Sequence, residues 1–270
     1  MLNNRSYNNT SRRRSRKNNN LEYTKGGIPK IIHQIWIGEK MPPIIKIYTT
    51  SFKDISGYKY KLWGNEDLNL FNFPLTWTYI NKLLRNKKII WAKIVDLMRL
   101  EILYHHGGIY VDTTMEYIKN LDKVINNNSK FIMSNESDCG LKCRGISGKL
   151  FISNSFIASV PEYKVLERLL SKEYLSKIDF SLPANICTGP YYVRTGIKRV
   201  SDVKMLPRKY IYAFSYDLHD YDKCISYIEK PGFIKTKYFN QIWYIKYPCD
   251  TFKDAIMIKH WDIGGTWINN

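Results

Sequence analysis

The stretch from residue 91 to residue 116 reads WAKIVDLMRLEILYHHGGIYVDTTME, and it decides our interpretation of the whole chain. Its first half repeats apolar residues at helical spacing, which predicts a deeply buried helix. The pair Gly107-Gly108 would end this helix, because glycine accepts the left-handed conformation that a helix exit needs. The run Ile109-Tyr110-Val111 then predicts a short strand, with Asp112 at its carboxyl end.

Charged residues in this stretch point to a site. Asp96 and Arg99 lie three residues apart, on one face of an otherwise apolar helix. Burying them is costly unless they pair or bind a ligand, so an intrahelical salt bridge and a ligand site are the alternatives. Asp112, Thr114 and Glu116 alternate, which predicts that all three point to the same side of one strand. Ligands bind at the carboxyl ends of strands in α/β sheets.

The remaining chain has the pattern of an α/β protein. Residues 28–38 are too continuously apolar for a half-exposed strand, so we expect a central strand of a parallel sheet, with His33 as a core histidine. The other expected elements are helices at 44–52 and 161–175, helical pieces at 65–88, strands at 58–63 and 131–133, and a surface loop at 134–149.

Length and charge set the domain organisation and the classes of partner. The 270 residues suffice for one large α/β domain, expected at residues 26–270. Residues 1–25 are rich in Asn, Ser and Arg, which predicts a disordered basic tail. The formal net charge of +18 favours a polyanionic partner: nucleic acid, an acidic membrane surface or a nucleotide diphosphate. We recognise no nucleic-acid-binding motif, so we expect no stable nucleic-acid partner.

Cysteine usage and hydropathy predict the compartment. The five cysteines are odd in number and scattered, which favours the cytoplasm or another reducing compartment. No run of 18 or more apolar residues is present and the amino terminus lacks a signal-peptide core, so we expect a soluble protein without a membrane anchor. The abundance of Asn, Lys, Ile and Tyr hints at an A/T-rich genome.

The pattern Asp-x-x-Arg, followed by Gly-Gly-Ile-Tyr-x-Asp-Thr-x-x-Glu, resembles the DXD-containing sugar-transferase family. Its members include fungal initiating α-1,6-mannosyltransferases and bacterial capsule glycosyltransferases, with the glucosyltransferase domains of large clostridial toxins as distant relatives. Further similar blocks lie at residues 28–36, 151–159, 188–190 and 255–267. The resemblance implies a GT-A type, Rossmann-like nucleotide-sugar fold, a single domain with a mixed central sheet. It also implies transfer of a hexose from a UDP- or GDP-sugar to a glycan or protein hydroxyl, with retention.

The resemblance also implies roles for individual residues. For Asn154 the alternative is that its side chain only caps a turn, and for Trp36 the alternative is that it is a core tryptophan. Lys259 or another cation would assist the phosphate. The implied site residues are Asp112 and Asn154 for catalysis, Trp36, Asp96, Arg99, Thr114, Gly189 and Trp267 for donor binding, and Asp112, Glu116 and His260 for a Mn²⁺ or Mg²⁺ ion.

One position departs from the family pattern. The motif is Asp-x-Asp in relatives, whereas this chain has Asp112-Thr113-Thr114. A neutral hydroxyl is a poor ligand for a hard cation. Three outcomes stay open: metal binding through Asp112, Glu116 and His260, catalysis with little metal that uses the chain's positive charge, or a catalytically silent relative.

Overall fold

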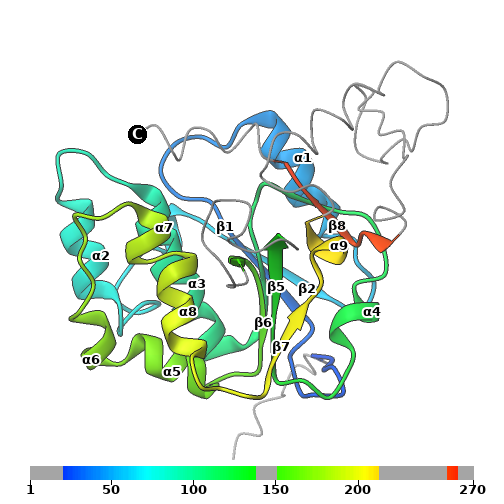
Figure 1. Ribbon diagram of the computed structural model, residues 1–270. Helices are drawn as coiled ribbons and strands as arrows, with labels where there is room; N and C mark the ends of the chain where they lie inside the picture. The colour runs from blue at the N-terminus through cyan, green and yellow to red at the C-terminus, as the bar shows by residue number, and fades with distance from the viewer. Residues whose placement is uncertain (1–20, 138–150, 213–253, 261–270) are drawn as a thin grey trace, which may run out of the picture.

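The computed structural model describes residues 21–137, 151–212 and 254–260. At the centre of the described part lies a six-stranded mixed sheet (Figure 1), which confirms the expected α/β class. β6 runs antiparallel to β3 and β5, and the other pairings in this sheet are parallel. In sheet order the strands are β2 (Lys59–Trp63), β1 (Ile31–Ile35), β3 (Gly108–Val111), β6 (Phe151–Ser159), β5 (Phe131–Ser137) and β7 (Val203–Leu206).

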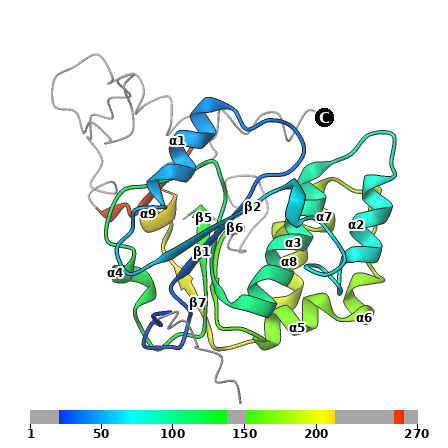
Figure 2. The same cartoon turned by 180° about the vertical axis from the view of Figure 1, so that it is seen from behind.

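Helices cover both faces of the sheet, as the two opposite views in Figures 1 and 2 show. One face carries α2 (Trp77–Leu84), α3 (Trp91–His106), α5 (Lys164–Leu170), α6 (Lys172–Leu175), α7 (Ala184–Cys187) and α8 (Pro190–Ile197). The other face carries α1 (Pro43–Ser51), α4 (Asp122–Ile125), α9 (Arg208–Ile211) and a small antiparallel sheet of β4 (Met115–Tyr117) and β8 (Met257–Lys259). A 3-10 turn, η1, spans Asn65–Asp67. No helix in the described ranges could span a membrane.

The helix α3 and its exit match the sequence prediction. Gly107 has φ +60°, a conformation that glycine adopts without strain, and an added Cβ would come within 2.6 Å of Pro161 Cδ. The chain therefore turns sharply into β3, whose four residues are all buried. Tyr110 belongs to the core on the α3 side, whereas Ile109 and Val111 belong to the core on the opposite side. This alternation anchors the strand between the two helical layers.

β1 lies inside the sheet, parallel to β2 and β3, as its continuous apolar run predicts. His33 on this strand is buried and satisfied: its Nε2 lies 3.1 Å from the Gly107 carbonyl oxygen, and its Nδ1 accepts from Trp63 Nε1 at 3.2 Å. These partners select the neutral imidazole, and burial together with nearby His106 lowers the His33 pKa to about 3. The prediction of a core histidine is confirmed.

The structure corrects the prediction that Asp112, Thr114 and Glu116 share one strand. β3 ends at Val111, and the Met115 N–H donates to the Asp112 carbonyl at 3.0 Å, which closes a turn over residues 112–115. Glu116 therefore belongs to β4 in the second sheet. The alternation of polar residues was compatible with a strand, but it carried no information on this turn.

Two loop predictions also need correction. Residues 134–137 continue β5 instead of starting a surface loop, because their backbone pairs with β6 and β7 regardless of their polar side chains. Residues 21–25 were expected in the tail, yet they contact the folded chain: the Glu22 carbonyl accepts from Lys30 N–H at 2.7 Å, and Tyr23 forms a bridge to Pro29. Residues 1–20 lie outside the described part.

Candidate functional site

The candidate site lies at the carboxyl end of β3, where Asp112 leaves the sheet. Its backbone is fixed on both sides: the Asp112 N–H donates to the Ser155 carbonyl at 2.9 Å, and Gln34 Nε2 donates to the Asp112 carbonyl at 3.1 Å. Gln34 belongs to β1 and Ser155 to β6, so three neighbouring strands hold this residue. The Asp112 side chain is 23% exposed, which leaves it accessible to a ligand.

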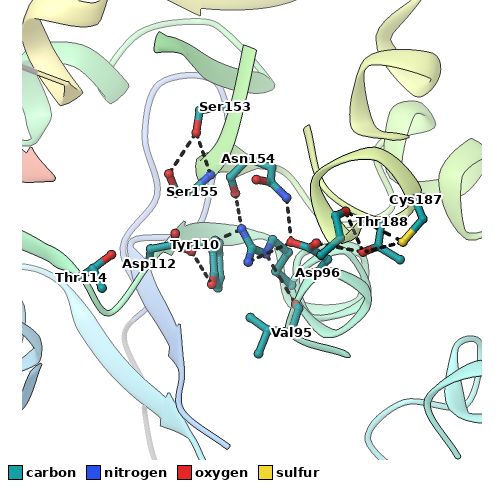
Figure 3. A network of polar contacts seen from close by, with 12 residues as sticks. Val95, Asp96, Tyr110, Asp112, Thr114, Ser153, Asn154, Ser155, Cys187 and Thr188 are labelled. Carbon is teal, nitrogen blue, oxygen red and sulfur yellow. Dashed lines mark hydrogen bonds and ion pairs between the residues drawn. The ribbon is translucent and has the colours of Figure 1, made fainter. Parts of the chain in front are cut away.

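Arg99 from α3 joins two carboxylates that lie on different elements (Figure 3). Its Nη2 lies 3.0 Å from Asp96 Oδ1, and its Nη1 lies 3.3 Å from Asp112 Oδ1. Nη1 also donates to the Asn154 carbonyl at 2.7 Å, and the guanidinium stacks over the Tyr110 ring at 4.4 Å. The Asp96–Arg99 salt bridge is therefore present, but it is one part of a larger network that reaches the strand-end carboxylate.

Asp96 ties three separate elements together. Its Oδ1 accepts from Asn154 Nδ2 on β6 at 2.8 Å, and its Oδ2 accepts from Thr188 Oγ1, between α7 and α8, at 2.9 Å. Burial raises the Asp96 pKa, and the cation of Arg99 and the Thr188 hydrogen bond act against that rise. Both carboxylate oxygens are thus occupied by protein donors, so Asp96 aligns Arg99 and Asn154.

An irregularity in β6 aims Asn154 at the helix. The β6 partner of Met133 is Ile157, but the β6 partner of the next β5 residue, Ser134, is Ser153. Residues 154–156 are consequently skipped in the pairing with β5, and such bulges re-aim side chains. The result is a buried amide that contacts Asp96 on α3 (Figure 3).

Gly189 follows Thr188 in the predicted turn, which the structure places between two helices. A Cβ at Gly189 would lie 2.8 Å from Asn185 Cα, so the residue must be small for the chain to turn here. The side chain that reaches the network is that of Thr188, which is fully buried. The sequence motif identified this turn, and the Thr188 hydroxyl within it contributes the contact with Asp96.

Lys259 of β8 reaches the site from the second sheet. Its Nζ lies 2.8 Å from Asp112 Oδ2 and also donates to Thr114 Oγ1. Asp112 Oδ1 meanwhile accepts from Tyr110 OH at 2.9 Å. Burial alone would raise the Asp112 pKa, but the Lys259 ammonium and the Arg99 guanidinium outweigh burial and lower this pKa to about 2. Asp112 is therefore an ionised carboxylate with a cation on each side.

Glu116 and His260 form a separate pair. His260 Nε2 lies 3.1 Å from Glu116 Oε2, and the imidazole stacks on the Tyr48 ring with 4.1 Å between centroids. Glu116 Oε1 is buried and has no hydrogen-bond partner among the described residues. Glu116 follows Asp112 closely in sequence and His260 directly follows Lys259, yet the side-chain contacts of this pair are with each other and with Tyr48 of α1.

The described side chains do not fit the metal site implied by the resemblance. Within residues 21–137, 151–212 and 254–260, no group of three or more His, Cys, Asp or Glu side chains could hold a metal ion. The Lys259 ammonium binds both Asp112 and Thr114, the two positions of the Asp-x-Asp motif. A divalent cation bound there would have to displace this ammonium.

The two predicted tryptophans have different outcomes. Trp36 follows β1 directly, its Nε1 donates to the Glu39 carbonyl at 2.8 Å, and its partly buried ring packs against Ile45 and Tyr48. These contacts place it near the carboxyl edge of the sheet, and its role beside a nucleotide base stays a prediction. Trp267 lies outside the described residues.

Several contacts in the network were missing from the sequence interpretation. They are the hydrogen bonds of Tyr110 and Thr188 to carboxylates and the bridging position of Lys259. The sequence offers one signal for Lys259: the motif lacks its second acid, and a lysine directly precedes His260.

Comparison with protein families gives a match over most of the chain. The family model described as capsular polysaccharide synthesis protein matches residues 2–179. Among individual proteins, an uncharacterized glycosyltransferase of Acanthamoeba polyphaga mimivirus is 29% identical over 197 residues, which cover 68% of this chain and 73% of that protein.

A fungal relative and a solved structure are more remote. Inositol phosphoceramide mannosyltransferase 1 of Schizosaccharomyces pombe is 24% identical over 143 residues, 52% of this chain and 40% of that protein. The chain thus spans less than half the length of this fungal relative. The solved PaToxG glycosyltransferase is 17% identical with a TM-score of 0.44, covering 64% of this chain and 69% of that structure.

Proposed function

Because this chain belongs to the capsular polysaccharide synthesis protein family, we propose that it is a glycosyltransferase of the GT-A type that transfers a hexose from a nucleotide sugar. The family match covers the helix α3, the strand β3 and the strand β6, which carry Arg99, Asp112 and Asn154. The family resemblance read from the sequence motifs is confirmed by this match. Donor, acceptor and stereochemistry belong to the proposal.

The observation that carries the proposal is the convergence of Asp96, Arg99 and Asp112 at the carboxyl end of β3. Three residues from two elements meet within 3.0–3.3 Å contacts, at the edge where α/β sheets bind ligands. Asp112 is the partly exposed member, and Asp96 and Arg99 lie behind it. We therefore assign Asp112 to direct donor contact and Asp96 and Arg99 to aligning it. The family resemblance gives Asp96 and Arg99 the further role of holding the donor's sugar hydroxyls.

The donor would be a UDP- or GDP-sugar, with Trp36 near the base and Trp267 over the donor. In the proposed transfer, the bond between sugar C1 and the β-phosphate oxygen breaks, and its electron pair leaves on the diphosphate. The acceptor oxygen forms a new bond to C1 on the same face, and its proton passes to the departing diphosphate. The configuration at C1 is retained and no protein base is required. Asn154, held by Asp96, would orient the sugar for this attack.

The acceptor in this proposal is a hydroxyl of a glycan or of a protein. The mimiviral relative is described as a glycosyltransferase and the fungal relative as a mannosyltransferase, which supports transfer of a hexose. The chain's positive charge suits an anionic donor. The proposal involves no nucleic-acid partner.

A nucleotide-sugar hydrolysis screen tests the proposal without knowledge of the acceptor. The full chain is incubated with a panel of UDP- and GDP-hexoses, with and without Mn²⁺, and the released nucleoside diphosphate is measured. We expect slow hydrolysis of one donor, since a site that activates C1 transfers to water when no acceptor is present. Failure to bind or hydrolyse any donor would contradict the proposed function. Tight binding without hydrolysis or transfer would identify a catalytically silent relative instead.

A further inference from the structure

A lysine bridges the two positions of the family's metal-binding motif. Lys259 Nζ contacts Asp112 Oδ2 at 2.8 Å and Thr114 Oγ1, the residue that replaces the second aspartate. We propose that Lys259 substitutes for the divalent cation at this position, so that donor binding and transfer proceed without added metal. This inference rests on the proposed glycosyltransferase function and names the group that balances the donor's diphosphate.

The charges of the buried network support this substitution. Asp96 and Asp112 supply two negative charges, Arg99 and Lys259 supply two positive charges, and the four cancel. With aspartate at position 114 and a neutral residue at position 259, the same network would carry an excess of two negative charges. That excess is what a divalent cation would neutralise. The present residues have already removed it, so a dication bound in the absence of donor would give the network a net positive charge.

The position of Lys259 is fixed by the backbone as well as by its ion pair. Met115 pairs with Lys259 in the β4–β8 ladder, and the His260 N–H donates to the Thr114 carbonyl at 2.9 Å. The lysine side chain is only 11% exposed, and Asp112 is 23% exposed. An ion pair this sheltered is screened by salt much less than a surface pair. The ammonium is therefore a permanent part of the site.

The chemistry of the leaving group needs such a charge. As the bond from C1 to the phosphate oxygen breaks, negative charge grows on the diphosphate, and a pre-positioned cation stabilises it. A lysine ammonium is a compact point charge that binds phosphate in many nucleotide sites. It can act here through its field and by sharing its hydrogens with the incoming phosphate oxygen.

The competing position for a metal is the pair of Glu116 and His260. The buried and unpartnered Glu116 Oε1 gives that pair one open acceptor. Two side chains alone are few for a catalytic ion, since Mn²⁺ and Mg²⁺ take about six ligands, mostly oxygen. The test nevertheless includes a variant of Glu116, because a metal ion bound to this pair would make the activity depend on metal.

The test begins with the wild-type full chain and a chelator. Affinity for the donor found in the hydrolysis screen and the rate of its hydrolysis are measured in EDTA and in Mn²⁺. We expect the same affinity and rate in both. An EDTA-sensitive rate that Mn²⁺ restores would overturn the inference and leave the glycosyltransferase function standing. If Glu116→Gln then abolished the restoration by Mn²⁺, the ion would lie on Glu116 and His260. Absence of donor binding in both conditions would overturn the inference and the proposed function together.

Variants of Lys259 provide the second arm. Lys259→Met should reduce hydrolysis about 100-fold, the usual effect of losing one charged stabiliser of the transition state. Lys259→Arg, which keeps the charge, should recover a large part of that loss. Lys164→Met is the matched control, because Lys164 Nζ lies 2.7 Å from Asp202 in an exposed ion pair away from the site. Full activity of a folded Lys259→Met protein would contradict the inference.

A charge exchange gives the most specific result. The double variant Thr114→Asp/Lys259→Met restores the second acid and removes the ammonium. We expect it to be inactive in EDTA and to regain activity with Mn²⁺, whereas the single variant Lys259→Met should respond to Mn²⁺ much less. Thermal melting checks that each variant is folded. An active, EDTA-resistant double variant would show that the charge at this position is unimportant and would overturn the inference.

Discussion

Two buried carboxylates on the same helix serve different purposes. Asp96 and Glu101 both lie on α3, and both are nearly inaccessible to solvent. Glu101 accepts from the backbone N–H groups of Leu75 and Thr76 at 2.6 and 2.9 Å, so it caps the segment that leads into α2. Asp96 instead contacts a guanidinium, an amide and a hydroxyl from elsewhere in the fold, and through Arg99 it connects to Asp112.

The comparison shows that burial of a charge does not by itself mark a functional site. Glu101 is held mainly by backbone N–H groups of the fold, and its partly exposed partner His105 lies at the end of α3 that leads into the start of β3, away from the carboxyl ends of the strands. The Asp96 network contains two cations, ends in a partly exposed carboxylate and lies at the carboxyl edge of the sheet. The kind of partner and the place in the fold distinguish the two carboxylates, and four predictions, in order of decreasing effect, test this distinction.

The largest effect is expected for Asp112→Asn. Loss of the carboxylate leaves Arg99 and Lys259 without their shared partner and removes the group assigned to the donor. Hydrolysis of the nucleotide sugar should fall about 100- to 1,000-fold, as measured by released nucleoside diphosphate. Asp202→Asn, an exposed acid paired with Lys164, is the control and should keep full activity. An active Asp112→Asn protein would contradict the assignment.

Glu101→Gln should show the opposite pattern. The amide cannot accept from Leu75, Thr76 and His105 together, so a buried donor loses its partner. The free energy of unfolding should fall by about 3 kcal/mol, measured by denaturant titration. Activity per folded molecule should be unchanged. Loss of activity in a correctly folded Glu101→Gln protein would erase the distinction between the two carboxylates.

Thr188→Val tests the connection of Asp96 to the α7–α8 turn. The hydroxyl donates to Asp96 Oδ2 at 2.9 Å in a fully buried position, so its removal should cost about 2 kcal/mol of stability. Because Thr188 acts through Asp96, the donor affinity should also weaken. Thr188→Ser keeps the hydroxyl and should restore the affinity more than the stability. Equal donor affinities of Thr188→Val and Thr188→Ser would show that the Thr188 hydroxyl has a purely structural role.

The smallest effect is expected when the pH is lowered, because the stability of the fold should then fall while donor binding at the site stays the same. The pKa of His33 is lowered to about 3 in the folded state against 6.5 in the unfolded chain. A lowered pKa gives stability that is fully present above pH 6.5 and is lost as the pH falls towards 3. Between pH 7 and pH 5.5 the loss should be about 1 kcal/mol, seen as a lower melting temperature.

Asp112 should not titrate in that interval, because its pKa is lowered to about 2. Its contribution is present above the unfolded value near 3.8 and is lost only as the pH falls towards 2. The donor affinity of the folded protein should therefore stay constant from pH 7 to pH 5.5 while the melting temperature drops. His33→Gln should remove most of the drop. A melting temperature independent of pH in the wild type would refute this account of His33.

Local sequence patterns predicted most of the fold because these elements form by local rules. The apolar spacing of α3, the glycines at its end and the apolar run of β1 each matched the structure. The turn after Asp112 was missed because a single backbone hydrogen bond redirects the chain there, and polar alternation is equally compatible with a strand. Residues 134–137 were missed because pairing with β6 and β7 overrides their polarity.

The candidate site was predictable only in part. Asp96, Arg99 and Asp112 came from a contiguous stretch, so spacing and family motifs located them. Lys259 lies 147 positions from Asp112, and its contact depends on the β4–β8 pairing, which no local pattern encodes. The same holds for Thr188, which reaches Asp96 across 92 positions. Long-range contacts of this kind follow from tertiary packing, and sequence spacing cannot give them.

The most direct measurement of the central claim is isothermal titration of the wild type, Asp112→Asn and Glu101→Gln with UDP- and GDP-hexoses. The account predicts that the wild type and Glu101→Gln bind the same donor with equal affinity, and that Asp112→Asn binds it at least about tenfold more weakly. Equal affinity of Asp112→Asn and the wild type, or no binding of any nucleotide sugar by the wild type, would contradict it.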